Sequence, residues 1–279
     1  MLDKLRHAWW ETASTFRRWR YANEIRTLNR LALFAPYSSG PFAARVALAM
    51  QAADQVFPLL HRLLDVSGRQ RLGPARSAVE FCTDDASQAA AIELRRLFNH
   101  YGSDKSSTHD YHHVYGRVLA GRSELDRILE IGLGSHHEDV VSNMGRLGKP
   151  GASLRAFRDF APDAQVYGAD IDRRVLFEEE RIKTFFVDQT ELASFDELAR
   201  QVGTGFDLII DDGLHTINAN LAVMLFALPR LKPGGWIVIE DIAPAAVPAW
   251  HVVASLLPAG VECELIQALD ALVFVLRKP

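Results

Sequence analysis

The chain has 279 residues, of which 48% are hydrophobic and 24% are charged, and its formal net charge is −4. This length is sufficient for one large hydrophobic core, or for one core with a small additional region. The charge balance gives no reason to expect nucleic acid as the main partner. No uninterrupted apolar run approaches the roughly 20 residues that cross a bilayer, so we expect no membrane-spanning helix.

Cysteine usage and the first residues bear on the cellular compartment. Cys82 and Cys263 lie far apart and match no metal-binding spacing, so we expect a reduced, cytoplasmic setting. Residues 1–20 are too polar and too interrupted to contain the apolar core of a signal peptide.

Residues 1–100 are predicted to be mostly helical and to form a cap or an oligomerisation region. Apolar side chains recur there at roughly helical spacing, at Leu2, Leu5, Trp9, Phe16 and Trp19. Residues 45–66 are predicted to form a second helical stretch, broken or kinked near Pro58. Residues 67–76 are interpreted as a linker, and residues 87–101 as a further amphipathic helix.

Charge is unevenly distributed along the chain. Residues 1–30 carry seven basic and three acidic side chains, a charge of +4, which leaves −8 on the remainder. A basic segment that contains tryptophans can lie on an anionic membrane surface. It can equally dock on an acidic face of this chain or of a second copy, so both membrane-surface contact and a homo-oligomer remain open alternatives.

From about residue 101, strands and helices alternate, which indicates a parallel sheet with helical crossovers. The predicted strands are residues 127–131, 165–169, 184–187, 206–210, 236–241, 262–267 and 271–276. Residues 221–231 and 250–257 are predicted to be helical. The last two strands are predicted to form a hairpin-like pair.

Acidic side chains gather at the ends of two predicted strands. They are Asp211 and Asp212, followed by Gly213 and His215, and then Glu240 and Asp241. Ligands lie outside the carboxyl ends of parallel strands, and neighbouring strands are ~4.8 Å apart. If three of these carboxylates meet there, with no Lys or Arg nearby in the sequence, their mutual repulsion would raise the pKa of at least one of them. A divalent cation removes that repulsion. We therefore expect a metal site; the structural alternative is an ordinary Asp-Gly turn.

The other strand ends carry residues suited to a nucleoside cofactor. Gly132 and Gly134 follow the first strand, where glycine lets the backbone approach a ligand closely. Asp170 ends the next strand, where an acid accepts hydrogen bonds from ribose hydroxyls. Asp188 and Gln189 end the third strand, where they are expected to meet an adenine edge. The predicted cofactor-binding residues are Lys105, Tyr111, Glu130, Gly132, Gly134, Asp170, Asp188, Gln189 and Asp211.

Residues 102–116 are rich in polar and aromatic side chains and precede the sheet. We expect Lys105 to meet a carboxylate of the cofactor, and Tyr111 and Tyr115 to form a lid over it. The segment is interpreted as a loop that orders on cofactor binding. Zinc is not expected, because no cysteine joins the nearby histidines and their spacing matches no common zinc motif. These histidines are His109, His112, His113, His136 and His137.

The arrangement resembles the class I S-adenosylmethionine-dependent methyltransferases over roughly residues 100–279. The resemblance implies a Rossmann-like α/β fold with strand order 3-2-1-4-5-7-6 and an antiparallel seventh strand, and it makes residues 101–279 the cofactor-binding domain. More narrowly, the chain resembles the metal-dependent macrolide sugar O-methyltransferases of the mycinamicin and macrocin type. The segments that carry this resemblance are GSDK at 102–105, DDGLH at 211–215 and ED at 240–241. The chain departs from the pattern at Ser135 and His136, where many methyltransferases have a third glycine.

The narrower resemblance also implies roles for individual residues. By matching position, Asp212, Glu240 and Asp241 would ligate Mg²⁺, and His215 would act as the general base. Asp212 and His215 are therefore the predicted catalytic residues.

The chemistry of the residues agrees with these implied roles. The methyl group of a sulfonium is already electrophilic, so the enzyme must mainly align a nucleophile. A sugar hydroxyl is a poor nucleophile at neutral pH, and a cation held by carboxylate oxygens lowers its pKa, which suits Mg²⁺. An imidazole with a pKa near ~6.5 can take the proton.

We therefore expect an S-adenosylmethionine-dependent, Mg-assisted O-methyltransferase that acts on a sugar hydroxyl of a glycoside, polysaccharide or glycolipid-like acceptor. Two alternatives remain open at this point. One is methylation of a phenolic or other small-molecule hydroxyl, and the other is a catalytically inactive cofactor-binding module that serves assembly.

Overall fold

The computed structural model describes residues 22–121 and 125–279, and it divides into two units, Met1–Gly68 and Arg69–Pro279. The boundary lies at residue 68 rather than at residue 100, because the helices of residues 78–101 pack with the sheet. Most of the basic segment 1–30, including its tryptophans, lies outside the described residues.

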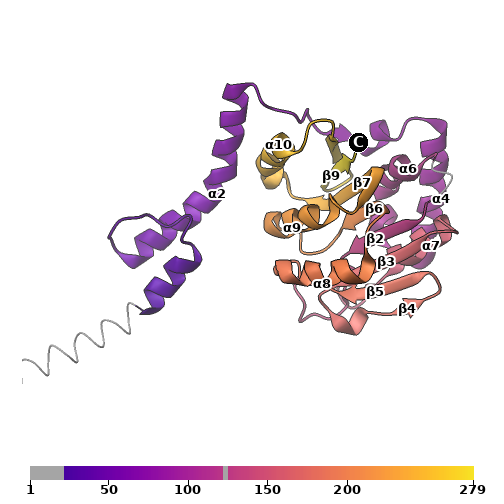
Figure 1. Ribbon diagram of the computed structural model, residues 1–279, viewed down its shortest axis with the longest axis horizontal. Helices are drawn as coiled ribbons and strands as arrows, with labels where there is room; N and C mark the ends of the chain where they lie inside the picture. Colours follow the sequence, from indigo (N-terminus) through magenta and orange to yellow (C-terminus); the bar gives the residue numbers. More distant parts are fainter. Residues whose placement is uncertain (1–21, 122–124) are drawn as a thin grey trace, which may run out of the picture. The chain divides into compact units, whose positions relative to one another are not determined.

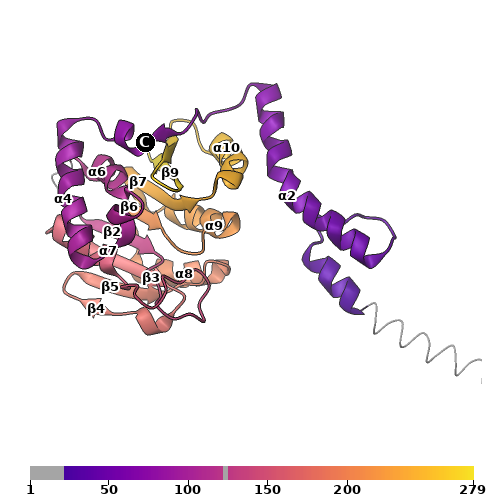
Figure 2. The same ribbon diagram turned by 180° about the vertical axis from the view of Figure 1, so that it is seen from behind.

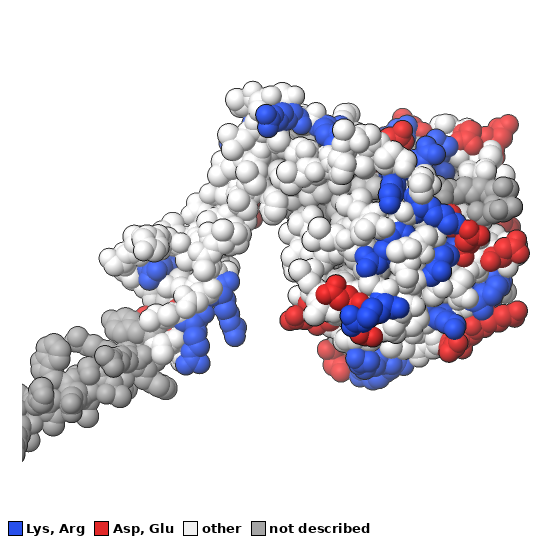
Figure 3. All heavy atoms as spheres, viewed as in Figure 1, with Lys and Arg blue, Asp and Glu red and all other residues white. Residues whose placement is uncertain are grey.

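The first unit is helical where it is described, as predicted. Residues 22–30 are helical, and α2 (Phe42–Ser67) follows them (Figure 1). The helix continues through Pro58 and ends at Gly68, whose φ of 63° places it in the left-handed conformation common after helix ends. Figure 3 shows that α2 presents mostly uncharged side chains on the face in view.

The second unit is built on one mixed sheet. In the described residues its strands are β1 (Arg76–Ser77), β2 (Arg127–Ile131), β3 (Gln165–Asp170), β4 (Glu178–Glu179), β5 (Ile182–Phe186), β6 (Phe206–Asp211), β7 (Leu231–Ile242), β8 (Glu262–Gln267) and β9 (Leu272–Arg277). Their order is β1-β8-β9-β7-β6-β2-β3-β5-β4. The seven longer strands follow the predicted order 3-2-1-4-5-7-6, and β9 is antiparallel to both β7 and β8. The two-residue strands β1 and β4 extend the sheet at its edges, so the end of the predicted linker is a strand.

Helices cover both faces of the sheet (Figures 1 and 2). They are α3 (Ala78–Phe81), α4 (Asp85–Tyr101), α5 (Asp104–Ser107), α6 (Tyr111–Leu119), α7 (Ala152–Phe160), α8 (Leu192–Val202), α9 (Ile217–Ala227) and α10 (Val247–Leu256), with short 3₁₀ turns at Arg173–Val175 and Pro244–Ala246. In β6, Leu208 and Ile210 pack in the core with α4, α6 and α7, whereas Ile209 packs with α8, α9 and α10. This alternation accounts for a strand that is apolar on both faces.

The register of the central strands brings the predicted site residues to one edge. Ile131 of β2 pairs with Asp211 of β6, and Asp211 pairs with Ile239 of β7. Asp212 and the acidic pair at the end of β7 are therefore neighbours in space. Across the described residues, no helix is both long and apolar enough to cross a membrane.

Candidate active site

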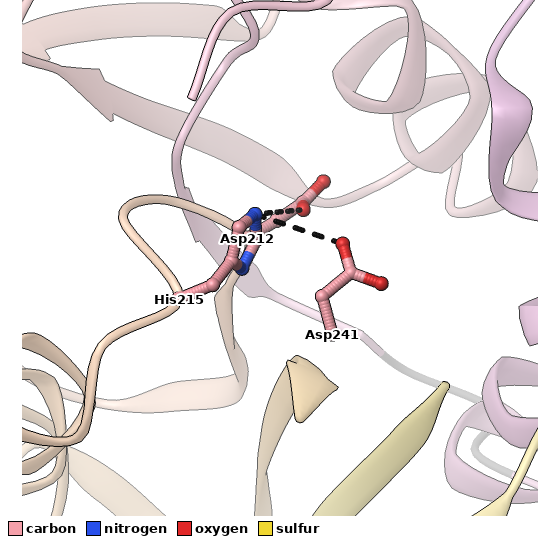
Figure 4. A group of neighbouring side chains, drawn as sticks. All are labelled: Asp212, His215 and Asp241. Carbon is pink, nitrogen blue, oxygen red and sulfur yellow. Dashed lines mark ion pairs between the residues drawn. The ribbon is translucent and has the colours of Figure 1, made fainter. Parts of the chain in front are cut away.

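Three side chains form a cluster beyond the ends of β6 and β7. Nε2 of His215 lies 3.6 Å from Oδ2 of Asp241 and 4.0 Å from Oδ1 of Asp212. Figure 4 shows the three side chains converging, His215 from the loop after β6 and Asp241 from the end of β7. One ligand atom from each lies within 4.8 Å of the others, and in the described part of the chain this is the group with spacing suited to a metal ion.

Each aspartate of this cluster has one oxygen held by another residue. Oδ2 of Asp212 lies 2.5 Å from Nζ of Lys105, and Oδ1 of Asp241 accepts a 2.5 Å hydrogen bond from the hydroxyl of Tyr111. The other oxygen of each carboxylate faces His215. The cluster therefore presents two carboxylate oxygens and an imidazole nitrogen to a common point.

Glu240, the third predicted metal ligand, is buried behind this cluster. Its Oε2 lies 2.5 Å from Nζ of Lys105, and its Oε1 accepts a hydrogen bond from the hydroxyl of Tyr115. The Lys105 ammonium also lies 3.0 Å from Oε1 of Glu130, whose other oxygen accepts a hydrogen bond from Ser153. Lys105 and Glu130, both predicted to bind the cofactor, thus pair with each other in this structure.

The charges of this buried group shift its pKa values. Burial lowers the pKa of Lys105, but the carboxylates of Asp212, Glu240 and Glu130 raise it well above its ordinary value. Burial, followed by the charge of Asp212, raises the pKa of Glu240, and burial also raises that of Glu130. The pKa of the lysine and the pKa values of the glutamates are raised together, because the single ammonium lies among three acids and does not offset the burial of both glutamates.

The predicted lid of Tyr111 and Tyr115 is wrong. Both side chains are buried, and their hydroxyls hold Asp241 and Glu240. The two tyrosines lie one helical turn apart on α6 and so share a face. Burial raises the pKa of each phenol, which keeps it a hydrogen-bond donor.

A bulge at the end of β7 lets both acids reach α6. Between the pairs Ile239–Phe274 and Ile242–Leu272 the register with β9 shifts, so two residues of β7 stand opposite one of β9. Successive strand residues normally point to opposite faces. Asp241, with a φ of 55°, departs from the extended conformation, and His215 has a φ of 54°. Positive φ is uncommon for residues other than glycine and often marks functional sites.

A cavity of about 390 Å³ adjoins the cluster and is lined by five of the predicted cofactor residues. They are Gly132, Gly134, Asp170, Asp188 and Gln189. Gly132 has a φ of 94°, and a Cβ atom there would lie 2.0 Å from the carbonyl oxygen of Asp212. Glycine is therefore required at this turn. This first cavity has the position expected for a nucleoside cofactor.

Asp172 is a cavity residue that the sequence reasoning missed. Its Oδ2 accepts a 2.7 Å hydrogen bond from Ser135, and its Oδ1 lies 2.7 Å from Nε of Arg174. The hydrogen bond from Arg174 is the main cause that lowers the pKa of Asp172, so it stays ionised. Asp170, in contrast, accepts hydrogen bonds from the backbone of Leu133 and Asp172 and so fixes the glycine turn. The signal for Asp172 was present in the sequence, since it lies two residues beyond Asp170.

Asp211 and Gln189 are placed differently from the prediction. Asp211 is fully buried and does not line the first cavity. It accepts hydrogen bonds from the side chains of Gln189 and Asn220 at 2.7 and 2.8 Å. Burial raises its pKa to about 6. The side-chain oxygen Oε1 of Gln189 accepts a hydrogen bond from the backbone N–H of Leu214. Both residues therefore anchor the loop that carries Asp212 and His215, although Gln189 still lines the cavity.

A second, smaller cavity of about 180 Å³ lies on the other side of Asp212. It is lined by Lys105, His215 and Asp241, and it shares Gly134 and Asp212 with the first cavity. Asp212 therefore borders both cavities, whereas His215 and Asp241 line the second one.

The histidines outside the cluster do not form a zinc site in the described residues. His109 instead pairs with Asp270 at 2.8 Å, and His112 contacts His113.

Comparison with known proteins supports this interpretation. Residues 147–242 match a family described as "Methyltransferase domain". Over 198 residues the chain is 32% identical to the 8-demethyl-8-alpha-L-rhamnosyl tetracenomycin-C 2'-O-methyltransferase of Streptomyces olivaceus, covering 70% of this chain and 45% of that protein. Over 130 residues it is 38% identical to the mycinamicin VI 2''-O-methyltransferase of Micromonospora griseorubida, covering 46% and 30% of the two chains.

A solved structure is also similar. The MycE methyltransferase from the mycinamycin biosynthetic pathway, in complex with Mg, SAH and mycinamycin VI, aligns with a TM-score of 0.53 and 26% identity, covering 67% of this chain and 53% of that one. The matches span less than half of the two curated relatives. The family match shows a methyltransferase domain in the chain, and the observed strand order is the one that the resemblance to the class I S-adenosylmethionine-dependent methyltransferases implies.

Proposed function

We propose that the chain is an S-adenosylmethionine-dependent, Mg-assisted O-methyltransferase that methylates a sugar hydroxyl of a glycoside-type acceptor. The observation that carries this proposal is the cluster of Asp212, His215 and Asp241, which lines the second cavity and borders the first through Asp212. The sugar acceptor is supported by the tetracenomycin relative, which is named as an O-methyltransferase of a rhamnosyl compound.

The first cavity suits the nucleoside part of the cofactor. The glycine turn allows close approach of a ligand to the backbone, and Asp172 offers an ionised carboxylate to ribose hydroxyls. Asp188 lines the same cavity and remains the predicted partner of the adenine.

The donor atoms of the cluster fit a hard divalent cation. Asp212 and Asp241 each direct one carboxylate oxygen toward the common point, and carboxylate oxygens are preferred ligands of Mg²⁺. Glu240 remains a predicted ligand, and for it to bind the ion, the Lys105 ammonium would have to leave its Oε2. His215 is the better base than ligand, because Mg²⁺ prefers oxygen to imidazole nitrogen.

The proposed mechanism divides the work among these residues. When bound, the cofactor supplies an electrophilic methyl group, and Mg²⁺ supplies the charge that lowers the pKa of the acceptor hydroxyl. Asp212 and Asp241 would hold the ion and so orient the acceptor hydroxyl. Nε2 of His215 accepts the proton of this hydroxyl as the hydroxyl oxygen takes the methyl group from the sulfur of the cofactor. Nδ1 of His215 is buried without a hydrogen-bond partner among the described residues, whereas Nε2 faces the two carboxylates, so Nε2 is the nitrogen directed toward the proposed reaction.

The test is transfer of labelled methyl from S-adenosylmethionine to a panel of rhamnosides, other glycosides and phenols. We expect transfer to glycosides that a chelator abolishes and added Mg²⁺ restores. His215→Ala should lower turnover at least about a hundredfold, while calorimetry shows S-adenosylhomocysteine affinity within about twofold of the unchanged chain. His136→Ala, at an exposed position outside the cluster, is the matched control. Full turnover in chelator would refute the metal role, and transfer to phenols alone would refute the acceptor class.

A further inference from the structure

Lys105 places an ammonium among the acids at the ends of β6 and β7. Its Nζ lies 2.5 Å from Asp212, 2.5 Å from Glu240 and 3.0 Å from Glu130, and the side chain is only 2% exposed. A buried ammonium has lost its hydration, so these carboxylates replace its water. The lysine comes from the short helix α5, far in sequence from the strands that carry the acids.

The ammonium and a divalent cation require the same oxygens. Glu240 has its Oε1 occupied by Tyr115 and its Oε2 by Lys105. Asp212 is shared, with Oδ2 on Lys105 and Oδ1 toward the cluster. Two cations at neighbouring positions on one carboxylate repel each other strongly where water is scarce. The Lys105 ammonium and a divalent cation therefore cannot both contact Asp212 and Glu240 at the same time.

On the basis of the proposed function, we propose that Lys105 is a positioning residue that competes with the divalent cation for Asp212 and Glu240. Its ammonium holds the buried acids together while no metal is bound. It yields Oε2 of Glu240 to the entering cation, and Tyr115 keeps the other oxygen of that carboxylate in place. The lysine thereby lowers the affinity of the site for metal and keeps its acids in position for binding.

The experiment compares metal affinity in the full chain and in Lys105→Met. Mn²⁺ binding is followed by the electron paramagnetic resonance signal of the free ion, with Mg²⁺ as competitor. We expect Lys105→Met to bind Mn²⁺ about tenfold more tightly, because the competing charge is gone. In chelator the variant should unfold at a lower temperature than the unchanged chain, and Mg²⁺ should raise its unfolding temperature more.

Lys149→Met is the matched control, because Lys149 lines the second cavity, as Lys105 does. It removes the same charge without removing the contact with the acids, and its Mn²⁺ affinity should stay within about twofold. An affinity in Lys105→Met that is unchanged or weaker would overturn the proposal. Absence of Mn²⁺ binding to the unchanged chain would instead refute the metal site of the proposed function.

Failure of Lys105→Met to fold is also informative. Lys105→Gln, which is neutral but retains a donor for one carboxylate, is then measured in the same way. Folding of either variant only in Mg²⁺ supports the proposal, because the ion then replaces the ammonium. Failure of both in saturating Mg²⁺ would contradict it.

Discussion

At the scale of residues, the site is made of carboxylates that are each held by a defined donor. The Tyr111 hydroxyl fixes one oxygen of Asp241 and the Lys105 ammonium fixes one oxygen of Asp212, which leaves the second oxygen of each carboxylate for chemistry. In the first cavity, Ser135 and Arg174 fix Asp172 through both of its carboxylate oxygens. A carboxylate that cannot rotate is already positioned for its ligand.

We predict that Asp172→Asn weakens binding of S-adenosylhomocysteine about tenfold, because it removes an ionised acceptor held beside the glycine turn. Isothermal titration calorimetry measures the change. Asp139→Asn is the control, since Asp139 pairs with the same Arg174 at 2.9 Å but is exposed. Equal effects of the two substitutions would show that Asp172 acts only through Arg174.

At the scale of elements, α6 carries the two tyrosines that bond to the acids at the end of β7. The same helix that holds the acids of β7 also buries His112, whose side chain is 3% exposed. Burial, together with the neighbouring charge of His113, lowers the pKa of His112 to about 4. Asp110 opposes this shift and Arg95 adds to it. A helix that carries a buried neutral histidine is sensitive to acid.

We predict that His112 makes the protein less stable as the pH falls. The folded-state pKa lies below the unfolded value of 6.5, so the stability is present above pH 6.5 and is lost progressively toward pH 4. The loss should be about 2 kcal/mol in the free energy of unfolding, measured by urea denaturation at pH 7.5 and pH 4.5. His112→Leu should reduce this difference, whereas exposed His136→Gln should leave it unchanged. Equal pH dependence in all three chains would contradict the prediction.

At the scale of the whole molecule, the chain consists of a helical unit and a sheet unit with its own core. The unit Arg69–Pro279 contains both hydrophobic clusters of the sheet and every residue of the proposed site. The role of the first unit as a cap or oligomerisation region stays a prediction.

We predict that a chain lacking residues 1–68 keeps its fold and its cofactor site. S-adenosylhomocysteine affinity should stay within about twofold, and the unfolding temperature within a few degrees, because the removed unit contributes little to the core of the sheet. Light scattering of both chains tests the predicted oligomerisation role of the first unit. If that role is correct, the truncated chain forms a smaller assembly. Loss of cofactor binding would show that the first unit completes the site.

The sequence by itself determined the alternation of strands and helices and the placement of Asp212, His215 and Asp241 after apolar strands, whereas the strand order was implied by the family resemblance. These features depend on local patterns, because apolar strands followed by turns and acids can be recognised from neighbouring residues alone. The glycine turn at Gly132 was predicted for the same reason. The alternation of the two cores across β6 follows directly from the apolar run.

Only the tertiary structure decided what surrounds these acids. The sequence argument relied on three acids without a nearby cation, yet the fold brings Lys105 to Asp212 from 107 residues away. Tyr111 and Tyr115 were expected over the cofactor, but the bulge in β7 turns both acids toward α6. Contacts between distant segments depend on packing and on one residue of register, which no local pattern encodes.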